Sequence, residues 1–286
     1  MNKKLLSIIA GFLIIISVVG SLLTYRYYAP EPISEEKIID SRQISMIDIN
    51  TNNADVNIYL TKEDSIKVTL EGEASLKHDK IFSVDTNDSL LSITYDEKQR
   101  RWFSFDIFQI FSPLTLNVYL PEKEYESFNV SNSNGDIAIE KQLLNEIELN
   151  TNNGEIELVE IDALNIIAEV NNGQINLKES IAQNIYVNID NGNVHFDHVE
   201  GDVDGEIQNG DALMTTKNLD RDITFNINNG DITIKTEKEP SNNQFNVTVA
   251  NGNIDILDEF YGSTTVGDGE NLIELTTMNG DISVVK

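Results

Sequence analysis

Residues Asn153–Leu177 read NGEIELVEIDALNIIAEVNNGQINL, one complete repeat followed by the start of the next. Asn-Gly occurs twice in this stretch, 19 residues apart. Ile156 and Leu158 lie three and five positions after the first asparagine, and the residues two, four and six positions before the second asparagine are also apolar. Apolar residues at every second position predict strands with one buried face. The stretch therefore predicts two strands and two corners in each repeat.

The same repeat recurs along most of the chain. Successive Asn-Gly pairs are 19, 19, 19, 18, 20, 22 and 28 residues apart, and the last spacing is lengthened near Leu257–Glu270. Self-similarity at about 20 residues is typical of a solenoid, whose units bury their apolar faces only by stacking on one another. We predict an all-β fold, a right-handed parallel β-solenoid (β-helix) of about eight coils. Its predicted corners are Asn134–Gly135, Asn153–Gly154, Asn172–Gly173, Asn191–Gly192, Asn209–Gly210, Asn229–Gly230, Asn251–Gly252 and Asn279–Gly280.

A meander of hairpins is the competing architecture, because Asn-Gly is also the strongest two-residue hairpin signal. A meander does not require the same turn every 19 residues, whereas stacking of equivalent positions does. In a stack the glycine reaches positive φ without steric cost, and asparagine amides about 4.8 Å apart can form a hydrogen-bonded ladder. One further apolar residue lies in the connection between repeats: Leu143, Leu164, Ile181, Val199 and Leu219.

The segments at the two ends differ from the repeat. Residues 37–120 contain strand-like runs without regular Asn-Gly and predict an atypical β cap that shields the open core. Within them, Ile49–Leu60 resembles a degenerate copy with Ala54 in place of the glycine. The repeats occupy residues 121–286 and reach Lys286 with no covering helix or loop, which predicts an exposed edge and self-association through that end.

The N-terminal segment predicts a membrane anchor. Leu5–Leu23 carries no charge over 19 residues, and at about 1.5 Å per residue this length covers the ~30 Å hydrocarbon core. Lys3 and Lys4 precede it, so the positive-inside rule keeps the N-terminus in the cytoplasm and places the rest outside the cell. A cleaved signal peptide is the alternative, but the apolar run is long for one and no A-x-A-like site follows. We expect residues 1–29 to form a cytoplasmic stub and single-pass transmembrane helix, and residues 30–36 a charged spacer.

Charge and cysteine content exclude several classes of function. The chain has 48 acidic and 20 basic side chains, a net charge of −28, and such a field repels nucleic acid. Residues 31–120 hold 16 acidic and 9 basic side chains, whereas residues 121–286 hold 32 and 8, so the acidic surplus belongs mainly to the repeats. The absence of cysteine excludes disulfides and thiolate zinc sites.

No catalytic constellation is found in the sequence. The histidines are His78, His195 and His198, and a strand would place the last two on opposite faces. A polysaccharide lyase is the enzyme alternative, but the basic residues of the repeats do not line up in the repeat frame. Asp202 and Asp222 both lie seven positions before their asparagine and could hold calcium, although no calcium-binding nonapeptide occurs. We expect a protein that is not an enzyme and has no cofactor.

Two features are candidate binding sites. Outward positions before the corners form a polar, amide-rich face that includes Asn150, Asn188 and Asn226, and this face fits either a repetitive glycan or solvent. The stretch Arg100–Pro113 is dense in aromatic residues and fits either the core of the cap or an exposed loop for a partner or the outer membrane leaflet. Its candidate residues are Trp102, Phe103, Phe105 and Phe108.

The segment Leu120–Glu140, LPEKEYESFNVSNSNGDIAIE, with the later NGEIEL, NGQINL, NGDITI, NGNIDI and NGDISV motifs, resembles a family of bacterial membrane-anchored, adhesin-like β-strand-repeat proteins of unknown function. The resemblance covers roughly residues 40–286 and is greatest to the LiaG-like members found with envelope-stress regulators in Gram-positive bacteria. It implies a solenoid fold and brings no catalytic motif.

These observations predict a non-enzymatic, membrane-anchored extracytoplasmic scaffold or binding module, acting in the cell-envelope stress response. Its acidic field suits cationic protein partners. A cell-wall polysaccharide-binding adhesin that uses the amide-rich face is the alternative, and a polysaccharide lyase is a weaker one.

Overall fold

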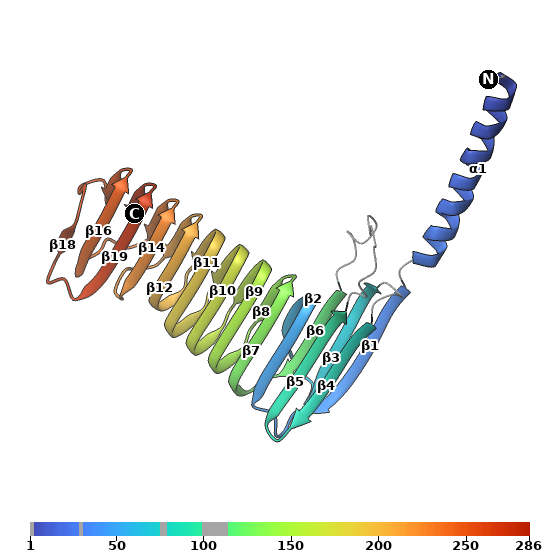
Figure 1. Ribbon diagram of the computed structural model, residues 1–286. Helices are drawn as coiled ribbons and strands as arrows, with labels where there is room; N and C mark the ends of the chain where they lie inside the picture. The colour runs from blue at the N-terminus through green and yellow to red at the C-terminus, as the bar shows by residue number, and fades with distance from the viewer. Residues whose placement is uncertain (1–2, 29–30, 75–78, 99–113) are drawn as a thin grey trace.

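The computed structural model describes residues 3–28, 31–74, 79–98 and 114–286, and beyond one N-terminal helix it is all-β (Figure 1). The helix α1 spans Lys3–Tyr28. Over the described residues the strands join into one 20-stranded sheet. The first six strands are β1 (Glu31–Asp40), β2 (Met46–Thr61), β3 (Ser65–Ala74), β4 (Asp79–Asn87), β5 (Leu90–Lys98) and β6 (Leu114–Pro121). The strands of the repeats are β7 (Glu124–Asn134), β8 (Ile137–Glu140), β9 (Leu143–Val159), β10 (Asp162–Lys178), β11 (Ile181–Asp197), β12 (Glu200–Asn209), β13 (Ala212–Thr216), β14 (Ile223–Asn229), β15 (Ile232–Thr236), β16 (Asn243–Asn251), β17 (Ile254–Ile256), β18 (Thr264–Val266), β19 (Asn271–Asn279) and β20 (Ile282–Val285).

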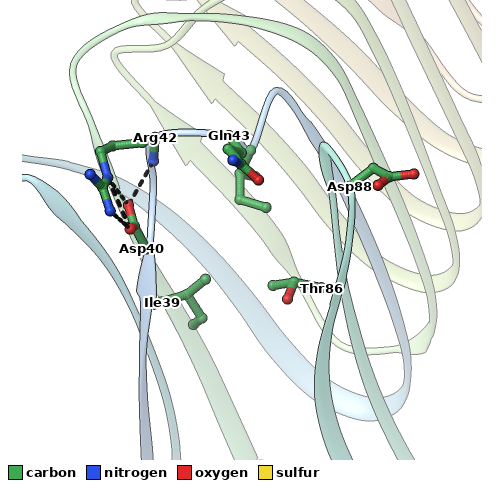
Figure 2. Close-up of a pocket in the computed structure, with 7 residues that line it drawn as sticks. Ile39, Asp40, Arg42, Gln43, Thr86 and Asp88 are labelled. Atoms are coloured by element: carbon green, nitrogen blue, oxygen red, sulfur yellow. Dashed lines mark hydrogen bonds and ion pairs between the residues drawn. The ribbon is translucent and has the colours of Figure 1, made fainter.

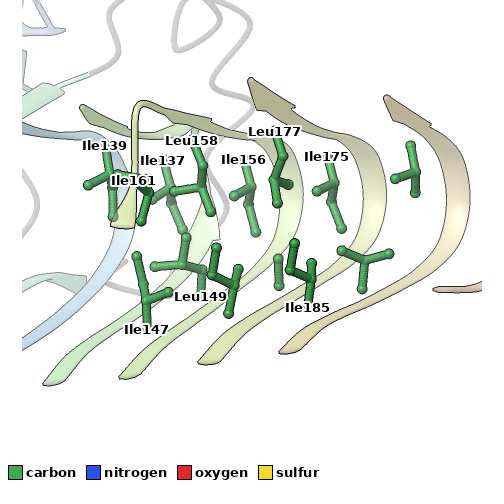
Figure 3. Packing of buried hydrophobic residues seen from close by; sticks show 14 of the residues in the cluster. Ile137, Ile139, Ile147, Leu149, Ile156, Leu158, Ile161, Ile175, Leu177 and Ile185 are labelled. Atoms are coloured by element: carbon green, nitrogen blue, oxygen red, sulfur yellow. The ribbon is translucent and has the colours of Figure 1, made fainter. Parts of the chain in front are cut away.

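Neighbouring repeats pair in parallel, with equivalent residues aligned. β9, β10 and β11 each run through a whole coil, and Asn153, Asn172 and Asn191 are in register across them. Each strand bends near its Asn-Gly pair, so the arms before and after the bend face each other across a narrow interior (Figure 3). The stacking is therefore parallel, as the repeat spacing indicates, while the handedness and the number of coils stay predictions.

The core is the row of inward side chains contributed by successive coils. Ile156 and Ile175 from the arms after the corner face Ile147 and Leu149 from the arms before it, and all four are fully buried (Figure 3). Burial of such a side chain contributes roughly 2 kcal/mol. Because each coil is only one strand thick on either side, these contacts form only when coils stack.

The apolar residues of the connections between repeats are not all buried. Val199 and Leu219 are buried, whereas Leu143, Leu164 and Ile181 are 46–51% exposed. Each connection forms a second corner of its coil. The side chain that enters the core there is one position before Leu143 and Ile181: Gln142 and Ser180 are buried, and so is Ile161 at the equivalent position of the coil between them. The backbone explains this placement. The residue directly before each of these three buried residues adopts positive φ, which turns the following side chain inward.

The final repeat does not lie at the end of the stack. β19 pairs with β14 on one side and β16 on the other, and β20 lies between β15 and β17. The expected exposed edge at the C-terminal strand is therefore wrong, because that strand has a neighbour on both sides. Instead β16 is outermost, and the short antiparallel strand β18 covers its first three residues.

At the other end of the stack, an antiparallel region covers the first coil. β2 pairs with β7 and β8 on one side and with β5 and β6 on the other, and Asn53 is in register with Asn134. β4 pairs antiparallel with β5, while β3 joins β6 and β1 joins β3. The predicted spacer is corrected here: Glu31–Glu36 belong to β1 and are paired with β3.

The helix α1 precedes this antiparallel region (Figure 1). Within the part of α1 and the rest of the chain whose side chains the structure describes, no helix has both the length and the apolarity to cross a membrane.

Candidate functional site

The asparagines of the corners form a continuous ladder of side-chain amides. In each coil the asparagine Nδ2 donates to Oδ1 of the asparagine before it in the stack, beginning with Asn134 to Asn53 at 2.8 Å. The donor–acceptor distances along the described ladder are 2.8–3.2 Å. The members in spatial order are Asn53, Asn134, Asn153, Asn172, Asn191, Asn209, Asn229, Asn279 and Asn251.

The glycine after each asparagine is required by close approach of the backbones as well as by positive φ. Gly173 has φ +151°, and a Cβ built there would lie 1.8 Å from the carbonyl oxygen of Gly154. No L side chain fits that space without moving a strand. The first coil differs: Ala54 takes the glycine position, and its carbonyl accepts from Asn132 Nδ2 at 2.8 Å.

A second row, two positions after each asparagine, was not singled out from the sequence. Where this position is Asp or Asn inside the stack, its side chain accepts the backbone N–H of the equivalent residue in the next coil, as when Asp211 accepts from Asp231 at 2.8 Å. Asp231 accepts from Asp281 at the same distance, and Asp281 from Asn253. The recurring Asn-Gly-Asp motif is the sequence signal for this row. Its role is structural, because the carboxylates satisfy backbone donors.

The second corner of four successive coils uses residues other than glycine at positive φ. Lys141, Glu160, Glu179 and His198 have φ of 49–54° and occupy equivalent positions. His198 Nδ1 lies 2.6 Å from Asp197 and its Nε2 lies 3.0 Å from Glu237. Hydrogen bonds with Glu237 and Asp197 raise the pKa of this imidazole above its ordinary value of 6.5. No residue type at these corners signals the conformation, so the sequence did not reveal it.

The outward face before the asparagine corner carries the predicted amide candidates. Asn150, Glu169, Asn188, Glu206 and Asn226 are directly in register on successive strands. The candidate asparagines are thus brought onto one face, but carboxylates separate them. Two strand spacings are roughly 10 Å, so the amides recur at that interval.

Two glutamates of this row and residues of the neighbouring row form a cluster of acids around one tyrosine, which we call the acidic patch: Glu169, Tyr186, Asp202, Asp204 and Glu206. Tyr186 is in register with Asp204, and the two glutamates flank it in the adjacent row. Partial burial, the charges of Glu206, Glu169 and Asp204, and a hydrogen bond with Glu206 raise the pKa of the Tyr186 hydroxyl. Among the described residues, none of these four carboxylates forms an ion pair. The repeat register of the sequence predicts that the acids share one face, whereas no sequence motif marks Tyr186.

One basic group near Asp202 of the patch, Arg221, is turned into the protein. Arg221 Nη2 donates to the carbonyl of Val199 at 2.8 Å and to Thr216 Oγ1 at 2.9 Å. Burial lowers the pKa of this guanidinium, and the charges of nearby acids partly offset that decrease. Its bonds go to oxygen atoms of a corner, so it does not neutralise the patch by direct pairing.

Of the calcium candidates, Asp202 lies in β12, and Asp222 directly precedes the neighbouring strand β14. Asp202 Oδ1 accepts the backbone N–H of Asp222 at 3.3 Å, and Asp222 Oδ1 accepts that of Leu272 at 2.7 Å. Backbone donors therefore engage both carboxylates. In the described part of the chain no group of three or more His, Cys, Asp or Glu is arranged to hold a metal ion.

The aromatic candidates Trp102, Phe103, Phe105 and Phe108 lie outside the described residues. A pocket of about 560 Å³ occurs elsewhere, between the β1–β2 connection and the β4–β5 turn (Figure 2). Ile39, Asp40, Arg42, Thr86 and Asp88 line it. Arg42 Nε lies 2.9 Å from both carboxylate oxygens of Asp40, and this guanidinium lowers the pKa of Asp40 to about 2. The cation of the pocket is already neutralised, which makes it a poor anion site.

Comparison with known proteins identifies the class. Residues 44–285 match the family model described as Toastrack DUF4097, and the chain belongs to this family. No curated protein matches the sequence significantly.

One solved structure shares the fold. A protein from Bacteroides fragilis described as "a putative adhesin" is similar with a TM-score of 0.52 at 12% identity, over 90% of this chain and 97% of that one. Another with the same description, from Parabacteroides merdae, has a TM-score of 0.43 at 14% identity, over 88% and 95%. At 12% identity the likeness to the Bacteroides fragilis protein concerns the fold alone. The resemblance to an adhesin-like β-repeat family of unknown function is thereby confirmed.

Proposed function

We propose that the protein is a non-enzymatic binding module that uses the acidic patch to hold a cationic segment of another protein. The supporting observation is that Glu169, Asp204 and Glu206 surround Tyr186 and have no ion-pair partner among the described residues. Unpaired acids attract and orient cationic groups, and a tyrosine ring face adds a cation–π contact. The family's adhesin-like members are consistent with a binding role.

The test measures binding of an oligolysine peptide to the full chain in an uncharged detergent by calorimetry. Asp204→Asn with Glu206→Gln removes two charges from the patch, and Glu140→Gln with Glu157→Gln removes two charges outside it. The patch variant should bind roughly five- to tenfold more weakly and the control nearly as tightly as the natural chain, since each exposed charge pair contributes up to about 1 kcal/mol. Equal weakening in both variants would mean that only net charge matters, and the patch would lose its role.

Salt gives a second readout of the same proposal. Electrostatic binding at an exposed surface weakens as ionic strength rises, because the Debye length falls to about 8 Å at physiological salt. Affinity that is unchanged between low and high salt would contradict a charge-driven site.

We infer a second candidate, binding of a cell-wall polysaccharide, from the recurrence of Asn150, Asn188 and Asn226 on every second coil. Amides at intervals of roughly 10 Å suit a polymer with a regular repeat. Retention on purified cell wall at high salt should be lost in the triple alanine variant and kept in Asn176→Ala. Retention of the triple variant would remove this candidate.

The cellular setting forms part of the proposal. We place the domain outside the cell, tethered by Leu5–Leu23, on the strength of its uncharged 19 residues and the preceding lysines. The resemblance to LiaG-like proteins adds envelope stress as the context. Protease added to intact cells should degrade the repeats, and alkaline carbonate should leave the protein in the membrane pellet. Release by carbonate or protection from protease would contradict the tether or its orientation.

A further inference from the structure

The Asn-Gly corners carry a chemical liability as well as a structural role. Glycine has no side chain to hinder its backbone nitrogen, so this nitrogen can attack the side-chain amide of the preceding asparagine. The attack requires the glycine N–H to lose its proton. An N–H held in a hydrogen bond between coils loses its proton only when the coils separate locally.

Seven of the eight Asn-Gly pairs hold the glycine N–H in a bond to the next coil or in the aligned sheet. Gly135 donates to Asn153 at 2.9 Å, Gly230 to Asn279 at 2.9 Å and Gly280 to Asn251 at 3.0 Å, always to the backbone oxygen. Gly210 does the same to Asn229 at 2.8 Å. The other three glycines, Gly154, Gly173 and Gly192, lie inside β9, β10 and β11 in parallel register with their neighbours.

Gly252 differs because its coil is outermost. β16 pairs with β19 on one side, and β18 reaches only as far as Phe245 on the other. Within the described chain, the Gly252 N–H therefore meets no hydrogen-bond acceptor. Gly252 is exposed, whereas the other seven glycines are half-buried.

The asparagine beside it is also the last member of the ladder. Asn251 Nδ2 donates to Asn279 Oδ1 at 3.0 Å and more weakly to the carbonyl of Met278 at 3.4 Å. Its own Oδ1 accepts no hydrogen bond from any described residue, whereas Oδ1 of each other ladder member accepts one.

We propose that Asn251–Gly252 is a site of spontaneous deamidation and that the stack protects the other seven pairs. The Gly252 nitrogen gives its proton to a solvent base and bonds to Cγ of Asn251, while the Cγ–Nδ2 bond breaks and ammonia leaves. Water then opens the resulting five-membered imide at either carbonyl and yields aspartate or isoaspartate. One water is consumed and one ammonia released, and no oxidant or reductant takes part.

The modification changes the end of the stack. The last Nδ2 donor is replaced by a carboxylate that faces Oδ1 of Asn279, and isoaspartate also lengthens the backbone at the corner. The outermost coil, β16 to β18, then loses contacts to β19 and β20, and the next coil becomes more exposed.

The test is peptide mapping of the full chain, incubated folded in warm, mildly alkaline buffer and, in parallel, in denaturant. In denaturant all eight pairs should react at comparable rates. In the folded chain Asn251 should react near its denatured rate, and the other seven at least about tenfold more slowly, because each needs a local opening. Similar rates at all eight pairs, or slow reaction at Asn251, would overturn the proposal.

Two controls separate this chemistry from general unfolding. Amide hydrogen exchange should be fast at Gly252 and slow at Gly280, whose N–H is bonded to Asn251. Asn251→Gln keeps an amide donor but forms its cyclic imide slowly, so it should abolish the fast modification while leaving exchange at Gly280 slow. Protection at Gly252, or persistence of the fast modification in the variant, would contradict the assignment.

Discussion

Asn251 Nδ2 donates to Oδ1 of Asn279 at 3.0 Å although Asn279 follows it by 28 residues, and Asn279 donates in turn to Asn229 at 2.9 Å. The spatial order of the last three repeats therefore differs from their order in the sequence. The residues around Leu257–Glu270 provide the chain needed to pass around the outermost coil and return. The asparagine ladder is unbroken where the last two repeats exchange their positions in the stack.

The ladder should contribute measurably to stability in its interior. Asn172→Ala removes the bond to Asn153 at 3.2 Å and the one from Asn191 at 3.1 Å, so we expect a loss of about 1–2 kcal/mol in the free energy of unfolding. Asn188→Ala, on the outward face, should change it by less than about 0.5 kcal/mol. Denaturant unfolding of both variants measures the difference, and equal effects would argue against the ladder.

The glycines should tolerate no side chain where backbones meet. Gly173→Ala places a Cβ 1.8 Å from the Gly154 carbonyl oxygen at φ +151°, so we expect destabilisation by about 3 kcal/mol or more. Gly262→Ala is the matched control, since no heavy atom lies within 4 Å of its Cβ position. A melting temperature for Gly173→Ala close to that of the control would contradict the close approach.

The second corner offers a stabilising substitution. Glu179 has φ +49°, a conformation that costs a residue with a side chain about 1 kcal/mol and glycine little. Glu179→Gly should therefore stabilise the fold by about 0.5–1 kcal/mol. Glu157→Gly, inside β9, should destabilise it by a similar amount. Thermal melts distinguish the two, and destabilisation by both would mean that the corner is not strained.

His198 should make stability depend on pH. Because Glu237 and Asp197 raise its pKa in the folded chain, the protonated imidazole adds stability that is fully present below its ordinary value of 6.5 and is lost as pH rises through the folded value. His198→Asn keeps a residue that tolerates positive φ but cannot titrate, so this part of the pH dependence should disappear. Identical pH profiles of stability for the two proteins would exclude the imidazole as its source.

Much of the fold follows from the sequence because the physical signals coincide. Alternation gives the strands, and the constant spacing of Asn-Gly gives the parallel register that aligns Asn153 with Asn172. The likeness of Ile49–Leu60 to a repeat corresponds to the pairing of Asn53 with Asn134.

Other features have no local signal. All coils share one pattern of buried and exposed positions, so the last two coils can exchange places while every strand stays in register with its neighbours. The longer spacing before Asn279 is the one sequence signal of this exchange. Positive φ at Glu160 or Glu179 cannot be read from a residue type that usually avoids it. This corner is also why Leu143 and Ile181 lie outside the core although they are apolar.

The candidate site likewise has one part that the sequence predicts and one part that it does not. Register alone places Asn150, Glu169 and Asn188 on one face. The pairing of charges is decided by contacts between distant segments, and so the unpaired state of the acidic patch and its tyrosine emerged only from the structure.

The order in which the coils stack is the central feature of this fold, and engineered disulfides measure it in a chain that has no cysteine of its own. Ser283 is in register with Thr233 on one side and with Asp255 on the other. Neighbouring strands are about 4.8 Å apart, within reach of a disulfide, and next-but-one strands are roughly 10 Å apart, beyond it. Oxidation should crosslink Thr233→Cys with Ser283→Cys and Ser283→Cys with Asp255→Cys within one chain, but not Thr233→Cys with Asp255→Cys. A crosslink between Thr233→Cys and Asp255→Cys, with none between Thr233→Cys and Ser283→Cys, would show stacking in sequence order and contradict the structure described.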